Sequence, residues 1–311
     1  MNQDTTQPPQ FHTASFHGTG GQLFGIQIVN FFLMIVTLGF YYPWARANTM
    51  KFMYDETSFM GERFEFHGTG KQMFIGYLKV IGIFVLLGVM SAIFGTAGMV
   101  IAYLLFIVLI PAAIHGALSY RMSHTSWRQI YFGYRGDLGT LVIKYIKGFL
   151  LTMITLGIYG AWFVMDVQRY VTGNIRAGSV KFGFEGKGGE YFRIFLGGYL
   201  LTIITAGIYG FWWMRDLYNY TADHTYVEHN GNQYFFHGSS TAGQVFRLSL
   251  GNILLIVFTL GIGTPWAIVR SMKYTVSNFR LHGAFDPSGI EQTEPAFADA
   301  TGDMLGDALG L

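Results

Sequence analysis

The chain has 311 residues, of which 51% are hydrophobic, 17% aromatic and 12% charged, and its mean hydropathy is +0.34. A soluble domain carries about 25% charged residues, so this composition excludes an ordinary soluble protein. The formal net charge of +2 gives no electrostatic basis for binding nucleic acid. Because there is no cysteine, disulfides, thiolate nucleophiles and cysteine metal sites are also excluded.

The first ten residues, MNQDTTQPPQ, are polar and lack the basic region of a cleavable signal peptide. We therefore expect residues 1–10 to be disordered and the first apolar segment to act as an uncleaved anchor. Residues 11–283 are expected to form a single transmembrane domain.

Long stretches of this domain contain no charged residue. Five such runs occur, at 5–45, 80–120, 148–165, 194–214 and 248–269. A transmembrane helix needs roughly 20 apolar residues, and the run 80–120 is long enough for two. The runs predict six membrane spans, and up to ten if every apolar segment turns back on itself.

An eight-residue pattern, TLGIYGAW, closes one apolar run and returns three more times with variations. Each copy has a glycine for a turn and a tryptophan just before the first charges, where such rings favour the edge of a bilayer. The four copies contain Gly39 and Trp44, Gly157 and Trp162, Gly207 and Trp212, and Gly261 and Trp266.

A short aromatic strand ending in glycine precedes each apolar segment, as in FEFHG, where the two phenylalanines share one face. The spacing gives a repeat of about 50 residues, typical of units that cannot bury their surfaces alone. The unit from Gly68 to Gly136 differs, with two apolar helices around FGTAG. The predicted fold is a polytopic α-helical membrane protein of about five repeats, each with a strand, a transmembrane helix, a T-x-G turn and a polar-striped helix.

Two topologies fit this repeat. If every unit is a hairpin, all strands lie on one side of the membrane and can pair into a small sheet outside the bilayer. If each helix after a tryptophan lies flat at the interface, successive strands lie on alternating sides. The distribution of lysine and arginine does not separate the two.

The helices after the tryptophans carry polar residues at positions +4, +7 and +11, which share one helical face. These residues are Asn48, Lys51 and Asp55; Asp166, Arg169 and Gly173; Asp216, Asn219 and Asp223; and Arg270, Lys273 and Ser277. Inside a bilayer such residues face a water-filled cavity or one another, which would make them the lining of a solute path. At the surface, the same stripe is a solvated face.

Histidines give weaker candidates. His115 lies in an apolar run four residues after Pro111, where an intramembrane histidine is either functional or satisfied by a neighbouring backbone group. Four strands end in histidine before glycine, and four converging imidazoles could bind a transition metal. These are His17, His67, His237 and His282. Arg135 and Glu185 occupy the same slot in two other strands, so repeated strand-end hydrogen bonds are the simpler interpretation and no metal is predicted.

The glycine runs FHGTGG and FEGKGG lack the spacing of a phosphate-binding loop and are interpreted as strand-to-helix turns. No catalytic triad, carboxylate pair or H-E-x-x-H motif occurs, so no catalytic residue, cofactor or enzymatic activity is predicted. A lipid-modifying activity is the remote exception. Residues 284–311 contain acidic residues but no lysine or arginine, which predicts a mostly disordered tail.

The segments FHGTGGQLFGIQIVNFFLMIVTLGFYYPWAR and GERFEFHGTG, with TLGIGTPW and the late strand FRLHG, resemble the YjgN-like family, domain of unknown function 898. The resemblance spans nearly the whole chain. Trp162 and Trp212 depart from it because no proline precedes them. The resemblance implies a multi-pass protein of the bacterial inner membrane and supplies no catalytic residues.

The first functional hypothesis is a channel or carrier whose polar cavity is lined by the residues after the tryptophans. The alternative is a scaffold, or a lipid-binding or partner-binding protein, that performs no transport. The expected partners are the lipid bilayer and a second copy or another membrane protein, with no nucleic acid.

Overall fold

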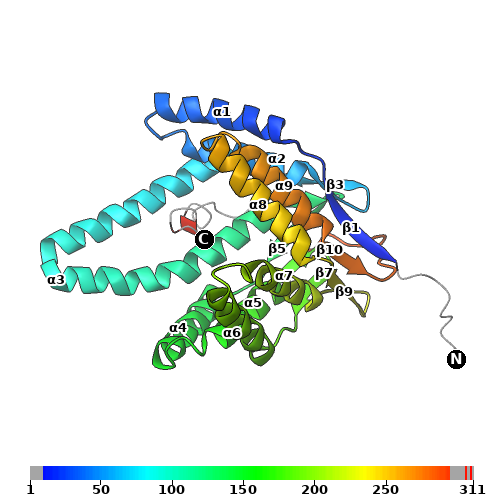
Figure 1. Cartoon of the computed structure of the whole chain (residues 1–311). Helices are drawn as coiled ribbons and strands as arrows, with labels where there is room; N and C mark the ends of the chain where they lie inside the picture. The colour runs from blue at the N-terminus through cyan, green and yellow to red at the C-terminus, as the bar shows by residue number, and fades with distance from the viewer. Residues whose placement is uncertain (1–9, 295–304, 307–308, 310–311) are drawn as a thin grey trace.

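The computed structural model describes residues 10–294, 305–306 and 309. Among residues 10–294, the order strand, helix, helix, strand recurs five times (Figure 1). In the second unit, a single kinked helix takes the place of the two helices. The helices are α1 (Gly20–Val36), α2 (Tyr42–Asp55), α3 (Gly70–Ser123), α4 (Leu138–Ile154), α5 (Gly160–Gly173), α6 (Gly188–Ile204), α7 (Gly210–Asp223), α8 (Ala242–Phe258) and α9 (Thr264–Ser277). The strands are β1 (Phe11–Phe16), β2 (Thr57–Phe59), β3 (Glu62–Phe66), β4 (Thr125–Trp127), β5 (Ile130–Tyr134), β6 (Ile175–Ala177), β7 (Val180–Phe184), β8 (Thr225–His229), β9 (Asn232–Gly238) and β10 (Phe279–His282).

The ten described strands form one closed antiparallel barrel. Each strand pairs with its neighbours in sequence, which are joined alternately by the helices of a unit and by a short turn, and the first and last strands close the ring, with Phe11 opposite His282. A strand of three to seven residues is marginal alone, but closure gives every described strand two partners and leaves no open edge among them. The barrel lies at one end of the molecule, on the right of Figure 1, and the helices extend from it.

The helices form a ring on the barrel. Each second helix of a pair packs against the first helix of the next pair, and α9 packs against α1. Three first helices begin with a capping box, in which a threonine side chain and a glutamine side chain satisfy each other's backbone N–H groups. These pairs are Thr19 with Gln22, Thr69 with Gln72, and Thr241 with Gln244.

The turns between paired helices explain the recurrence of T-x-G. In the pair α4–α5, Gly157 has a φ of +94°, and its N–H donates to the carbonyl of Thr152 at 2.7 Å. The hydroxyl of Thr155 donates to the carbonyl of Leu151 and accepts from the N–H of Tyr159. Glycine is required here because other residues rarely adopt this backbone conformation.

Helix α3 occupies the position of a helix pair and is much longer than the others. Its 54 residues bend at Gly95, where φ is +55° and ψ is −132°. The arm before this bend has eight more residues than α1, which adds about 12 Å at 1.5 Å per residue. Figure 1 shows the resulting hairpin extending far beyond the other helices.

The predicted fold class, a polytopic α-helical membrane protein, is wrong, because the described strands close into a barrel and most helices are short. Within residues 10–294, α3 is the one helix long and apolar enough to cross a membrane. The number of membrane spans was overestimated because each charge-free run continues through a turn between two helices or, in α3, through the bend at Gly95. The run 194–214, for example, joins the end of α6, the turn and the start of α7. Helices of 14 to 17 residues fall short of the roughly 20 that a span needs.

The predicted disordered ends coincide only in part with described residues. Of residues 1–10, the structure describes Gln10, whose carbonyl accepts from the N–H of Gly283. The structure describes part of the tail predicted from 284, and several of these residues are packed. Phe285 is 6% exposed and Glu294 is 7% exposed, and Leu305 packs against α3. The rest of the tail lies outside the described residues.

Candidate functional site

The polar stripe does not line a common cavity. Arg169 donates to the carbonyl of Gly186 at 2.7 Å and to the carboxylate of Asp166 at 3.0 Å. Asn219 donates to the carbonyl of Ser240 and accepts from its N–H. Both +7 side chains therefore hold the strand-to-helix turn of the next unit, which is a structural role.

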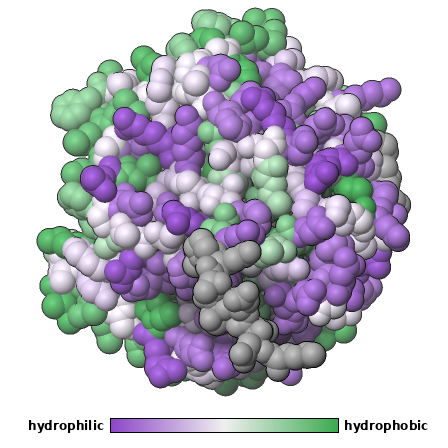
Figure 2. Space-filling model, turned by 90° about the vertical axis from the view of Figure 1, so that its right-hand side faces the viewer, coloured by the Kyte–Doolittle hydropathy of each residue, from purple (hydrophilic) through white to green (hydrophobic). Residues whose placement is uncertain are grey.

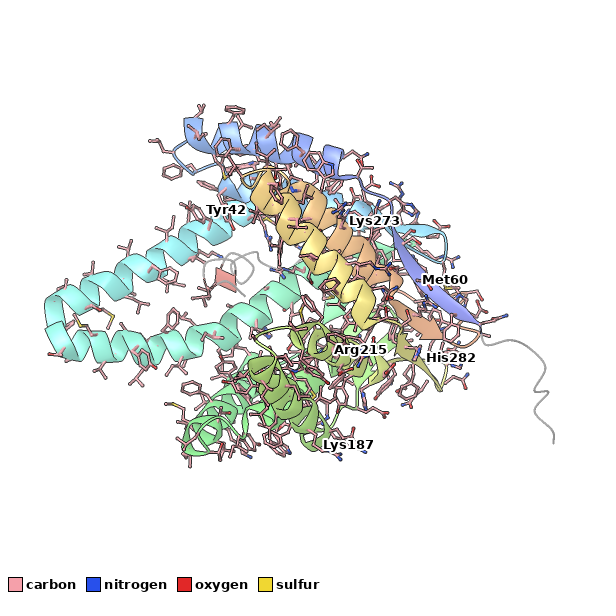
Figure 3. All side chains as sticks on the ribbon, viewed as in Figure 1. Tyr42, Met60, Lys187, Arg215, Lys273 and His282 are labelled. Atoms are coloured by element: carbon pink, nitrogen blue, oxygen red, sulfur yellow. The ribbon has the colours of Figure 1, made fainter. Side chains whose placement is uncertain are left out.

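The other stripe residues are also separate. Asp216 accepts from the neighbouring Arg215, whereas Arg270 and Lys273 are exposed on α9. Figure 3 shows Arg215 and Lys273 on different helices. Asn48 donates to Asn30 of α1 and, with Lys51 and Asp55, lines a groove of about 690 Å³ between α1 and α2. The structure thus divides the predicted set among several local environments.

His115 lies on α3 beside the barrel, with its ring 5.4 Å from the ring of Tyr134 on β5. Within the described part of the chain, neither the Nδ1 of His115 nor the hydroxyl of Tyr134 has a hydrogen-bond partner. Burial raises the pKa of the Tyr134 hydroxyl above its ordinary value of 10.0.

The four strand-end histidines do not converge on one point. The Nε2 atoms of His17 and His67 lie 2.8 Å from the hydroxyls of Ser58 and Ser126 respectively. His237 lies 3.0 Å from the carboxylate of Asp223, and His282 packs against Phe11. Among residues 10–294, 305–306 and 309, no group of three histidine, cysteine or carboxylate side chains is placed to hold a metal ion.

Three of the four motif tryptophans pack against the next unit. Trp44 lies against Gly70 and Phe74, and a Cβ on Gly70 would approach the indole ring to 2.3 Å. Trp162 packs in the same way on Gly188 and Phe192, and Trp266 packs on Gly20 and Phe24. Trp212 differs, because the position that matches Gly70 holds Ala242, and Phe246 packs against Phe211 instead. The glycine and the aromatic residue four positions later are the sequence signal for this contact, which the sequence analysis missed.

The barrel encloses an apolar cavity of about 480 Å³, which sequence reasoning also missed. Apart from Thr275, its lining side chains are apolar. The strands contribute Ala14, Phe59, Phe64, Trp127, Ile130, Phe132, Ala177, Val180, Phe182, Val227, Phe236, Phe279 and Leu281, and α9 contributes Thr275 and Val276. The alternation in FEFHG is the available signal, because Phe64 points inward from it.

The tail segment 285–294 closes one side of this cavity and then runs along the barrel. Phe285 and Ile290 line the cavity. Further along, the N–H of Ser179 donates to the carbonyl of Glu291 at 2.8 Å, and the N–H of Tyr131 donates to Gln292.

An ion pair fixes the end of this segment. Arg135 donates to both carboxylate oxygens of Glu294, at 2.6 and 3.2 Å. The hydrogen bond and the negative charge of Glu294 raise the pKa of Arg135. The carboxylate of Glu294 fills the space that a side chain at Gly133 would need.

The two ends of the molecule differ in the hydropathy of their surfaces. The barrel end is mostly hydrophilic, with hydrophobic residues gathered toward its edge (Figure 2). The helix turns at the other end expose large apolar side chains, including Leu38 (89%), Leu156 (94%) and Leu260 (93%). Of the 18 consecutive residues that form the most apolar part of α3, 17% are buried. A core helix of a soluble protein would be mostly buried, so α3 is not such a helix. These features define a membrane-associated protein with an apolar cavity in a closed barrel.

The comparisons with known proteins agree with this class. The family described as "Bacterial protein of unknown function (DUF898)" matches residues 11–185, 179–238 and 216–308, and the chain belongs to this family. The resemblance to YjgN-like proteins stated from the sequence is therefore confirmed.

Two curated relatives are each named "Inner membrane protein YjgN". The protein of Salmonella typhimurium is 28% identical over 173 residues, which cover 49% of this chain and 42% of the relative. That of Escherichia coli K12 is 31% identical over 154 residues, which cover 49% of this chain and 38% of the relative. The match thus covers less than half the length of these relatives. Their names support the predicted inner-membrane localisation. No solved structure matches the chain.

Proposed function

We propose that the protein is a lipid-binding protein of the inner membrane that holds an acyl chain inside its barrel. The observation that carries this proposal is the apolar cavity of about 480 Å³. Ligand pockets commonly measure about 300–1,000 Å³ and are lined mainly by hydrophobic and aromatic side chains. Because the described residues of the lining include no charged side chain, the group that enters must itself be apolar.

The position of the cavity supports a ligand from the membrane. Thr275, Val276 and Phe279 line it where α9 joins β10, so it reaches the base of the helix layer. A chain entering from that side exchanges one apolar environment for another, and its polar headgroup stays outside. The opposite side is covered by Phe285 and Ile290.

This proposal replaces the transport hypothesis as the preferred one. The transport hypothesis needs the residues after the tryptophans to share a polar cavity, but Arg169 and Asn219 bind backbone groups of the next unit. The support therefore moves to the lipid-binding alternative. We propose no catalytic residue, since the lining residues that the structure describes include no nucleophile or general base apart from the hydroxyl of Thr275.

Equilibrium binding tests the proposal. Purified protein in detergent is incubated with tritiated palmitic acid and, separately, with tritiated phosphatidylglycerol. Ala177→Leu places a larger side chain in the cavity and reduces its free volume. It should therefore lower binding of the acyl chain by about tenfold or more. Ala161→Leu is the matched control, because Ala161 is equally buried but lies on α5, away from the cavity lining. Equal binding by Ala177→Leu and wild-type protein would reject the cavity as the site.

A further inference from the structure

Basic residues occupy a defined level on the helices that leave the barrel. Helix α3 carries Lys71, Lys79 and Arg121, α4 carries Lys144 and Lys147, α6 carries Arg193 and α8 carries Arg247, whereas α1 carries no basic residue. Glu190 is the one acidic residue in α1, α3, α4, α6 and α8, and it lies in the first turn of α6. Lys144, Lys147, Arg193 and Arg247 are all exposed. The helix layer therefore presents positive charge near the barrel.

Beyond these residues, the helices are uncharged up to the turns. Arg193 is followed by 11 residues before α6 ends at Ile204, and Arg247 is followed by 11 before α8 ends at Phe258. Eleven helical residues span about 16 Å, which matches the depth of one leaflet in a hydrocarbon core about 30 Å thick. These segments expose Ile204 (77%) and Phe258 (81%).

Helix α3 follows the same arrangement at a greater depth. Phe94, the last residue before the bend, lies fifteen positions after Lys79, a rise of about 22 Å along the helix. Tyr103 and Phe106 are exposed on the returning arm. The α3 hairpin thus passes the middle of a bilayer when its basic residues lie at the surface.

The second helices do not cancel this charge. Asp166 is paired with Arg169, and Asp216 with Arg215, so these carboxylates are neutralised within their own helices. Arg270 and Lys273 add two exposed cations on α9. A ring of basic side chains next to exposed apolar helix matches the boundary between phosphate headgroups and acyl chains.

We propose that four hairpins, α1–α2, α4–α5, α6–α7 and α8–α9, enter one leaflet only, that α3 extends deeper, and that the basic ring binds anionic phospholipid headgroups. The partner is the leaflet that faces the barrel, and the recognised group is the phosphate of an anionic lipid such as phosphatidylglycerol. The amphipathic stems of lysine and arginine lie along the apolar helices while their charged ends reach the phosphates. This inference does not depend on acyl-chain binding in the barrel.

Depth is tested with single cysteines, which the cysteine-free chain allows. Leu156→Cys and Phe94→Cys are labelled with bimane and reconstituted into vesicles that contain phospholipids brominated at defined carbons. Bimane at 156, in the turn of α4–α5, should be quenched most by bromines near the chain ends. The unlabelled Leu156→Cys protein should resist an impermeant thiol reagent added on either side. Bimane at 94 should be quenched by lipids of both leaflets. Reaction at 156 with reagent on the side opposite the barrel would overturn the one-leaflet depth.

Headgroup binding is tested separately, with energy transfer from tryptophan to dansyl-phosphatidylglycerol or dansyl-phosphatidylcholine in mixed vesicles. Wild-type protein should prefer the anionic probe by about fivefold or more at low salt, and the preference should fall as salt rises. The variant Lys144→Gln, Lys147→Gln, Arg247→Gln should lose most of this preference. The control variant Arg128→Gln, Lys181→Gln alters two exposed cations of the barrel strands and turns and should retain it. Equal binding of both probes by wild-type protein would overturn headgroup recognition.

Discussion

Single residues fix a segment that composition alone describes as disordered. The tail has no lysine or arginine of its own, yet Glu294 meets Arg135 across 159 positions of sequence. The Glu294 side chain is 3% exposed, whereas that of Arg135 is 53% exposed. Solvent therefore screens one partner, and the pair contributes about 1 kcal/mol rather than the value of a fully buried pair.

Glu294→Gln removes the charge but keeps the shape of the side chain. We expect its free energy of unfolding to fall by about 1 kcal/mol, and a protease should cut between 285 and 294 more readily. Glu291→Gln is the matched control, because Glu291 contacts Ser179 through its backbone. Proteolysis at the same rate in wild-type protein and Glu294→Gln would show that the ion pair does not hold the segment.

Asp137 caps α4 and links its stability to pH. Its carboxylate accepts from the N–H of Thr140 at 2.7 Å, and this hydrogen bond lowers the pKa of Asp137 below its ordinary value of 3.8. A lowered pKa means that the stabilisation is full above the ordinary value and disappears as pH falls through the lowered one.

Asp137→Ala should therefore lower Tm at pH 7, and the difference from wild type should shrink in acid below pH 3.8. Asp137→Asn should remain close to wild type at neutral pH, because asparagine also caps helices. Thermal unfolding in detergent at several pH values measures both. A Tm difference that does not change with pH would contradict the role of the carboxylate charge.

At the scale of elements, the turns determine where the helices reverse. Four equivalent glycines, Gly39, Gly157, Gly207 and Gly261, have φ between +89° and +95°. The preceding residues also have positive φ, including Leu156 at +51°, which costs about 1 kcal/mol for a residue other than glycine. A leucine retained at this cost while 94% exposed is consistent with a turn that faces lipid.

Gly157→Ala should destabilise the protein by about 1–2 kcal/mol, because alanine rarely adopts this backbone conformation. Gly25→Ala is the matched control, since Gly25 lies inside α1 with open space around its Cα. Gly25→Ala should leave Tm unchanged or raise it, because alanine favours helix. Chemical denaturation in mixed micelles measures the free energy of unfolding of both variants and of wild-type protein. Equal stability of Gly157→Ala and wild type would contradict a strained turn.

The sequence predicted individual elements better than their assembly. The aromatic segments ending in glycine are strands, and the T-x-G sequences are turns between helices. Closure of the barrel was not predictable because the pairing of Phe11 with His282 joins segments 271 positions apart. The polar residues at +4, +7 and +11 all lie within the second helices, at spacings that share one helical face. That spacing does not say what the face meets, so Arg169 was taken for a cavity residue although it binds a backbone carbonyl.

At the scale of the whole molecule, the α3 hairpin extends far beyond a ring of shorter pairs. Replacing residues 86–104 with the turn sequence of 155–159 would shorten α3 to nearly the length of the α4–α5 pair. The barrel should remain intact, because the strand pairs of β3 and β4 lie outside the replaced segment. The variant should stay with membranes but leave them at a lower urea concentration, since less apolar surface is buried in lipid.

Far-ultraviolet circular dichroism and urea extraction of membranes test this expectation. A helix of scrambled apolar sequence but unchanged length, placed at 86–104, is the control and should resist extraction as wild type does. Extraction of the shortened variant at the wild-type concentration would show that the other four hairpins alone determine anchoring.

Pairing of β1 with β10 also constrains the order of assembly. Until 279–282 has been synthesised, β1 lacks one of its two neighbouring strands. The strand made last likewise has only one partner until the next strand is made. If synthesis stops before this point, the chain forms an open sheet. The strands at its two edges then have unpaired N–H and C=O groups. Such a product is a ready target for quality-control proteases, so premature termination should remove this protein from the cell rather than leave a shortened, working form.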